Sequence, residues 1–388
     1  MIYDFLVIGG GIAGASAAYE LAVHGSVLLL EAESTTGYHA TGRSAALFTR
    51  NYGSTIVRQV NAASADFFRS PPNGFCETPL LTPRGSLTVA APDHDGALAD
   101  LLAMSEPGEE VCRIDPKDAC EMVPFLRQDR VGHAVFEANV TDIDVANLHL
   151  SYLKGAKARG AVIMTKQQVA ALSRHANVWK VQTAKDSYSA AKIINAAGAW
   201  ADQIGDMAGA GRIGLIPKRR TAIIIKAPEG IQCGALPAVD FAGSGAYMKP
   251  DAGKLMASPG DATPTEPHDA WPDDMDIAVF ADWIERETTI KVAKIEHSWA
   301  GLRSFVADEA PVAGFDTKVE DFFWLAGQGG FGIMMAPALA ALTADLCAQV
   351  PGADTKHFAW ALSPERLLRS PSKTGQPAFG NAQTGNAT

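Results

Sequence analysis

The sequence predicts an α/β fold that begins with a βαβ unit of the dinucleotide-binding type and contains a second, β-rich region. Three observations support this fold class. A short β-type run, a glycine-rich turn and a small-residue helix lead directly into a second apolar run. Glycine-rich turns follow two later strand-like runs, and further strand-like runs fill the middle of the chain. With 388 residues, the chain is long enough for two or three domains.

The opening unit spans residues 3–31. "YDFLVI" predicts the first strand, and "AGASAAYELAVHG" predicts a helix that ends at Gly25, which suits the C′ position. "SVLLLEA" predicts a second buried strand that ends at Glu31. The order of strand, glycine turn, helix and strand is that of a βαβ unit.

The turn "GGGIAG" places Gly9, Gly11 and Gly14 in G-x-G-x-x-G spacing. Such glycines permit a tight turn, a close approach of the backbone to a pyrophosphate and close packing of helix on strand. Glu31 follows about 20 residues later, where an acid accepts from a ribose hydroxyl. The alternative is a turn without a ligand, and the surrounding strand, helix and acid disfavour it.

Two later turns favour a flavin over a nicotinamide. "NAAGAW" (195–200) ends a strand with small residues, and "GQGGFG" (327–332) precedes a long helix. The start of that helix can stabilise negative charge on a reduced flavin ring.

Other elements are predicted from periodicity and caps. "TGRSAA" is expected to start a second, flavin-facing helix, and residues 142–161 a helix capped by Asp144. Strands are expected at 85–91, 161–172, 178–184, 187–198, 217–227, 246–258 and 322–326, helical turns at 95–105, and a polar tail from residue 371.

Composition narrows the function classes. The apolar fraction is 47% and the net charge is −10, which argues against a broad nucleic-acid surface. Cys76, Cys112, Cys120, Cys233 and Cys347 are scattered, which favours a reduced, cytoplasmic protein. No leader, membrane-spanning run, metal-ligand spacing or G-x-S-x-G motif is recognised.

The sequence resembles the D-amino acid oxidase superfamily of FAD-dependent amine oxidoreductases, and within it the bacterial D-arginine/D-amino acid dehydrogenase group. The matching stretches run in the family's order and span nearly the whole chain: "VIGGGIAGAS", "GYHATGRSAALFTRNYG", "GFCETPLLTPRG", "NAAGAWAD", "PKRRTA", "AYMKPDAG", "SWAGLRSFVAD" and "GQGGFGI".

This resemblance implies a fold of the glycine oxidase/D-amino acid oxidase type. A discontinuous, Rossmann-like FAD-binding domain would comprise residues 1–75, 141–212 and 296–370. A β-rich, α+β substrate domain would comprise residues 76–140 and 213–295, and residues 371–388 would be a polar tail.

The resemblance also implies non-covalent FAD. The residues expected to bind it are Gly9, Gly11, Ile12, Ala13, Gly14, Glu31, Ala32, Arg43, Ser44, Ala45, Ala46, Val169, Ala197, Gly198, Trp200, Arg303, Gly329, Gly330, Phe331, Gly332 and Ile333.

For the substrate, the resemblance implies a carboxylate held by Arg220 and Arg303, with hydroxyls from Tyr52 and Tyr247. A guanidinium forms a bidentate pair with a carboxylate, which agrees with this role. By residue type alone Arg220 belongs to a solvated basic cluster, whereas Arg303 lies in an apolar run and needs a partner. Further expected pocket residues are Leu47, Thr49, Ser86, Asp240, Gly301 and Gly330.

Two positions depart from the arginine-preferring relatives. Leu47 stands where they have a histidine near the substrate, and Ser86 where they have a glutamate. Losing that buried charge pair costs a cationic substrate about 2–5 kcal/mol, so an arginine preference is not expected. Asp240 either faces the substrate or is a surface loop acid, and its residue type favours the loop.

The expected reaction is oxidation of an amino acid Cα–N bond by hydride transfer to flavin N5, followed by hydrolysis of the imine to a 2-oxo acid and ammonia. A quinone or oxygen would accept the electrons. Alternatives are oxidation of an N-alkyl amino acid or a 2-hydroxy acid by the same fold, or a flavin subunit of a hetero-oligomeric enzyme.

Overall fold

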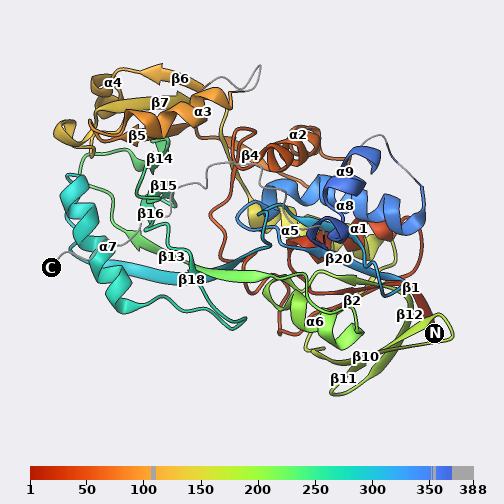
Figure 1. The fold of residues 1–388 in the computed structure, drawn as a ribbon. Helices are drawn as coiled ribbons and strands as arrows, with labels where there is room; N and C mark the ends of the chain where they lie inside the picture. Colours follow the sequence, from red (N-terminus) through yellow and green to blue (C-terminus); the bar gives the residue numbers. More distant parts are fainter. Residues whose placement is uncertain (106–110, 351, 353–354, 369–388) are drawn as a thin grey trace.

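The computed structural model describes residues 1–105, 111–350, 352 and 355–368, so the predicted tail at 371–388 lies outside the described residues. The described chain forms two lobes side by side. One contains β1, β2, β10, β11, β12 and β20, and the other contains β5, β6, β7, β13, β14, β15 and β16 (Figure 1). Within the described part, no helix is both long and apolar enough to cross a membrane.

The first lobe is built on an eight-stranded sheet. Its order is β10-β11-β12-β1-β2-β9, with β20 beside β12 and β19 beside β20. The parallel pairs β1–β12 and β1–β2 form the centre. The strands are β1 Ile2–Ile8, β2 Val27–Leu30, β9 Val162–Met164, β10 Val169–His175, β11 Val178–Thr183, β12 Ser187–Asn195, β19 Val312–Phe315 and β20 Phe322–Ala326.

Helices cover both faces of this sheet. α1 (Ile12–Leu21), α5 (Val145–Ala158) and α8 (Gly332–Ala348) share one hydrophobic core with α2 (Thr55–Arg69) and α9 (Thr355–Ala361). On the opposite face, α6 (Ala201–Ala208) packs against β11, β12 and β20 in a second core. The predicted opening βαβ unit is therefore present.

The C-terminal end of α1 differs from the prediction. The helix ends at Leu21 with Ala22 as its C-cap, so Gly25 is not the C′ residue. Gly25 instead leaves room for the Asp4 side chain, because a Cβ there would lie 2.7 Å from an Asp4 carboxylate oxygen. That carboxylate accepts hydrogen bonds from the backbone N–H and the hydroxyl of Ser26.

The second lobe is built on a nine-stranded sheet of order β17-β13-β16-β15-β14-β5-β7-β6, with β18 beside β13. α4 (Pro116–Met122) and α7 (Asp274–Glu287) pack on one of its faces. The strands are β5 Ser86–Ala90, β6 Val111–Ile114, β7 His133–Glu137, β13 Ile216–Ile225, β14 Ala238–Phe241, β15 Tyr247–Asp251, β16 Lys254–Ser258, β17 Thr263–Pro264 and β18 Ile295–Phe305. The helical turns expected at 95–105 are η1 (Asp95–Leu98) and α3 (Ala99–Ala103).

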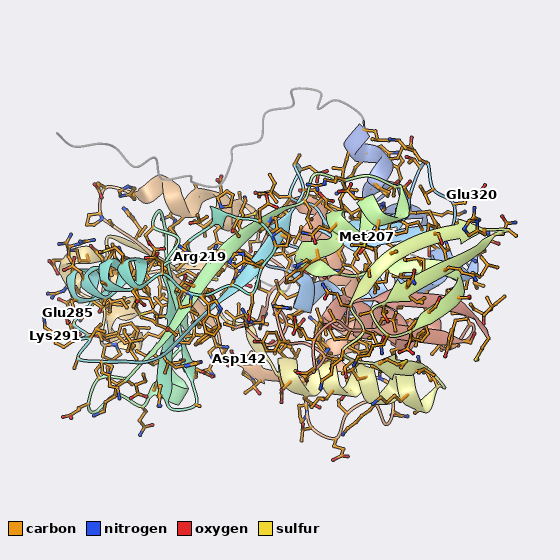
Figure 2. The ribbon with its side chains drawn as sticks, turned by 90° about the horizontal axis from the view of Figure 1, so that it is seen from below. Asp142, Met207, Arg219, Glu285, Lys291 and Glu320 are labelled. Atoms are coloured by element: carbon orange, nitrogen blue, oxygen red, sulfur yellow. The ribbon has the colours of Figure 1, made fainter. Side chains whose placement is uncertain are left out.

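A small three-stranded sheet lies where the lobes meet. It pairs β3 (Leu47–Phe48), β8 (Thr141–Ile143) and β4 (Leu81–Pro83). Asp142 lies at this junction and binds Arg84 of the β4–β5 connection and Lys249 of β15 (Figure 2). β18, which begins at the predicted domain boundary near residue 296, pairs along its length with β13 of the second sheet. The predicted domain bounds stay a prediction.

Two local expectations near this junction are wrong. Residues 41–46 form turns and irregular backbone, not the start of a helix, because Thr41 and Arg43 are anchored to other segments. Residues 142–143 belong to β8, and α5 begins only at Val145, although the Asp144 side chain caps it as predicted by accepting from Asn147 N–H.

Candidate functional site

One cavity of about 510 Å³ extends from the turn after β1 to the second sheet, within the size range of small-molecule sites. It is lined by all three glycine-rich turns. The expected residues that line it are Gly9, Gly11, Ile12, Ala13, Glu31, Ala32, Arg43, Ser44, Ala45, Val169, Ala197, Gly198, Trp200, Arg220, Tyr247, Gly301, Arg303, Gly329, Gly330, Gly332 and Ile333. Those that do not line it are Gly14, Ala46, Leu47, Thr49, Tyr52, Ser86, Asp240 and Phe331.

The glycines of the first turn are required by close approach of the backbone. Gly9 has a φ of +108°, and a Cβ there would lie 2.3 Å from the Ala196 carbonyl oxygen. A Cβ on Gly14 would lie 1.9 Å from the Gly9 carbonyl oxygen. The two glycines hold the start of α1 against the end of β1, which leaves the helix N-terminus open to an anionic group such as a pyrophosphate.

Glu31 is a buried carboxylate that is fixed by the backbone. Its Oε2 accepts from Gly10 N–H at 2.8 Å and its Oε1 accepts from Glu33 N–H at 2.8 Å. It also lines the cavity, and each oxygen keeps a lone pair. Glu31 is thus oriented to accept hydroxyl hydrogens, as a ribose offers.

The third turn brings the N-terminus of α8 to the same cavity. Gly329 has a φ of +52°, and a Cβ there would lie 2.3 Å from the Phe305 ring. A Cβ on Gly330 would lie 3.1 Å from Nη1 of Arg303. The turn therefore packs directly on β18, and the positive end of a 17-residue helix faces the cavity.

At the other end, the cavity is lined by Arg220, Arg303 and Tyr247, which we call the arginine end. Arg303 Nη2 donates to the Tyr247 hydroxyl at 3.3 Å, and Arg220 Cζ lies 6.0 Å from the centre of the Tyr247 ring. In the register of β13 with β18, Arg220 lies opposite Gly301, where a Cβ would lie 3.6 Å from Cβ of Arg43.

No acidic side chain among the described residues forms an ion pair with Arg220 or Arg303, and Arg220 Nε is buried without a hydrogen-bond partner. Burial and the neighbouring charge of Arg303 lower the pKa of Arg220. Burial raises the pKa of Tyr247, but Arg303 and Arg220 outweigh it, so the net shift is downward. The two guanidiniums form no ion pair within the described chain that would compete with an anionic ligand.

Tyr52 lies at the margin of the site. It is half exposed and packs edge-on against Phe331, with ring centres 5.1 Å apart. It does not line the cavity.

Arg43 is held by contacts within the chain. Its guanidinium binds Asp269 and donates to the carbonyl oxygens of Ala270 and Ala300, both at 2.9 Å. These bonds fix the loop that lines the cavity to β18 and to the segment before α7. A direct cofactor contact from the guanidinium stays a prediction.

Two expected pocket residues, Asp240 and Ser86, lie on strands beyond Tyr247. Asp240 is in β14, between β15 and β5, so its interpretation as a surface loop acid is wrong. Ser86 Oγ donates to Asp240 Oδ2 at 3.3 Å, and burial raises the pKa of Asp240 to about 6. Thr49 donates its hydroxyl to Glu137 of β7. Leu47, in β3, is half-buried and contributes no polar atom.

The sequence reasoning missed Trp299 and Ser258. Trp299 lines the cavity and donates from Nε1 to the Arg43 carbonyl oxygen at 3.0 Å. Trp299, Gly301 and Arg303 alternate along β18, and this period of two in "SWAGLR" could have found the tryptophan. Ser258 is fully buried and hydrogen-bonds Tyr247, a contact that nothing in the sequence pattern marks.

Comparison with known proteins gives a family match over residues 4–346, to the family described as DAO, FAD dependent oxidoreductase. The chain is 23% identical over 394 residues to glycine oxidase of Geobacillus kaustophilus, covering 96% of this chain and 98% of that protein. It is 28% identical over 212 residues to mitochondrial dimethylglycine dehydrogenase of Homo sapiens, covering 53% of this chain and 24% of that protein. The crystal structure of L-proline dehydrogenase from P. horikoshii is similar with a TM-score of 0.80 at 22% identity, covering 95% of this chain and 98% of that one.

Proposed function

The chain belongs to the DAO family of FAD dependent oxidoreductases, and from this premise we propose that it oxidises the Cα–N bond of an amino acid. Its cofactor is FAD, and the three glycine turns, the buried Glu31 and the N-termini of α1 and α8 fit that group in one cavity. The proposal extends to a D-amino acid dehydrogenase-like activity that is not selective for arginine.

The observation that supports an amino acid substrate is the arginine end. Two enclosed guanidiniums lie beside a tyrosine hydroxyl and form no ion pair within the described chain. A substrate carboxylate could accept hydrogen bonds from both guanidiniums. Because Arg303 lies against Gly330 of the third glycine turn, the Cα carbon of that substrate would lie near this turn.

FAD, when bound, supplies the acceptor that takes up a hydride at N5. The chain's own contribution is orientation: Arg220 and Arg303 bind the carboxylate, and Tyr247 adds a hydroxyl that Ser258 and Arg303 hold in place. No side-chain base is required if the amine binds neutral, which is consistent with Leu47 in place of a polar group. The resulting imine is hydrolysed by water to a 2-oxo acid and ammonia.

A secondary amine is the second candidate substrate. The half-buried, apolar Leu47 suits an N-alkyl group better than a polar residue would. Dimethylglycine dehydrogenase, one of the similar proteins, is named for an N-methylated amino acid.

Anaerobic reduction of the bound flavin tests both candidates. The purified holoenzyme is mixed with D-amino, L-amino, N-methyl amino and 2-hydroxy acids, and loss of flavin absorbance is followed. We expect rapid bleaching by one or more amino acids. If no amino acid of either configuration, methylated or not, bleaches the flavin, the proposed function is wrong. The re-oxidation rate in oxygen and with a quinone then identifies the acceptor.

A further inference from the structure

Asp240 faces the same side of the second sheet as the arginine end. It lies directly opposite Tyr247 in the antiparallel pair β14–β15, and side chains of directly opposed residues point to the same face. Tyr247 in turn accepts a hydrogen bond from Arg303. The acid therefore lies one strand beyond the tyrosine that borders the expected carboxylate site.

Asp240 has no cationic partner within the described chain. It accepts a hydrogen bond from the hydroxyl of Ser86, which lies 3.3 Å from Oδ2. Other enclosed acids of this sheet and its edge are paired: Asp142 binds Arg84 and Lys249, and Asp261 lies 3.5 Å from Arg219. Burying an ionised carboxylate without a cation costs free energy. A cationic group on a ligand would reduce that cost at Asp240.

The position of Asp240 selects which part of the substrate can reach it. β14 is separated from β13, the strand of Arg220, by β15 and β16, a backbone separation of about 14 Å. The arginine side chains reach toward Tyr247 and so shorten this gap. The α-nitrogen of an amino acid is attached to the carbon next to the carboxylate, whereas a nitrogen at the end of the side chain extends further toward β14. A group at the end of the side chain is therefore the better match for Asp240.

The hydrogen bond from Ser86 affects which kind of cationic group Asp240 can bind. It uses one lone pair of Oδ2, while Oδ1 accepts no hydrogen bond within the described chain. A single ammonium N–H needs only Oδ1, whereas the bidentate pair that a guanidinium prefers would have to share Oδ2 with Ser86.

We propose that Asp240, held by Ser86, is a specificity-determining residue that pairs with a terminal amino group on the substrate side chain. The substrate class is then amino acids with a second, basic nitrogen. This inference rests on the proposed function for the carboxylate anchored at Arg220 and Arg303.

Ligands without an α-amino group test this subsite without any oxidation. The holoenzyme is titrated at about pH 8 with γ-aminobutyrate, δ-aminovalerate and ε-aminocaproate, each beside butyrate, valerate or caproate of the same chain length. Binding is followed by the flavin absorbance spectrum and by thermal stabilisation. We expect at least one ω-amino acid to bind about tenfold or more tightly than its alkyl partner.

Two variants sharpen the test. Asp240→Asn should remove the preference for the ω-ammonium group while leaving alkyl carboxylate binding within about twofold. Asp251→Asn, an exposed acid in the same sheet, should keep the preference. Equal binding of the two members of every ligand pair, or a preference that survives Asp240→Asn, overturns the proposal, as does failure of all carboxylates to bind.

Failure of the subsite and failure of the proposed function can be told apart. Norvaline and norleucine, in both configurations, carry no second nitrogen and test flavin reduction without Asp240. If they bleach the flavin but the ligand pairs bind equally, only the subsite is wrong. If the ligand pairs differ as expected but no amino acid bleaches the flavin, only the proposed oxidation is wrong.

Discussion

The two ends of the large cavity are built by different means. The glycine end, at the turn of Gly9 and Gly14, is shaped by backbone that a side chain would block. The arginine end is shaped by long side chains from β13, β15 and β18 that converge on one face of the second sheet. The first end is thus fixed by local chain geometry and the second by strand register. Substitutions at the two ends should therefore fail in different ways.

The largest effect is expected at the glycine end. In Gly14→Ala, the new Cβ would lie 1.9 Å from the Gly9 carbonyl oxygen, so the start of α1 must move. We expect a loss of about 3 kcal/mol or more in the free energy of unfolding and loss of bound FAD. Urea unfolding and the FAD-to-protein ratio measure both. The control Gly234→Ala places its Cβ in open space and should change neither; full FAD content in Gly14→Ala would contradict the prediction.

At the arginine end, Arg303→Ala and Arg220→Ala should leave FAD bound and weaken the substrate. Each removes a cation from the expected carboxylate site at a cost of about 2–5 kcal/mol in substrate binding. Stopped-flow reduction of the flavin at varied substrate concentration measures the loss. Arg212→Ala removes an exposed arginine of the first lobe and should behave as the native protein. Native reduction kinetics in both variants of the arginine end would refute the carboxylate site.

A smaller effect is expected from Asp240. Its ionised side chain should destabilise the unliganded protein but strengthen the binding of a cationic ligand. The pKa of this acid rises from 3.8 to about 6 on burial, so ionisation above pH 6 disfavours the folded state, and below pH 3.8 the penalty is absent. The rise corresponds to at most roughly 3 kcal/mol, which partial access to solvent reduces to about 1–2 kcal/mol.

Asp240→Asn should therefore stabilise the unliganded protein at about pH 8 and leave its stability unchanged near pH 4. Chemical unfolding at the two pH values measures this difference. A loss of stability at high pH would show that Asp240 has a compensating partner, contrary to the contacts seen here.

The smallest effects are expected from the tyrosine hydroxyls. Tyr247→Phe removes a hydroxyl that Arg303 and Ser258 contact, and should weaken substrate binding by about 1–1.5 kcal/mol. Tyr52→Phe changes a half-exposed residue outside the cavity lining and should cost less than about 0.5 kcal/mol. The half-saturating substrate concentration in flavin reduction compares them. A larger loss for Tyr52→Phe would place its hydroxyl against the bound substrate.

Much of the fold follows from local patterns. The opening strand, glycine turn and helix, the Asp144 cap of α5 and the turn before α8 are where the sequence predicts them. The DAO family and the α/β fold class are confirmed, while the D-arginine/D-amino acid dehydrogenase subgroup, the domain bounds and the site roles stay predictions. The errors at Gly25 and at residues 41–46 arose where a distant partner, such as Asp4 or Ala300, decided the backbone.

What the sequence determined by itself is the nucleotide side of the cavity. Only glycine can be used where the backbone must lie within van der Waals distance of another segment. The sequence therefore shows these positions directly, as "GGGIAG" and "GQGGFG". Only the tertiary structure decided which side chains meet across the second sheet. Asp240, Tyr247 and Arg303 come from three strands, and their meeting depends on pairing register and side-chain length, which no local spacing encodes.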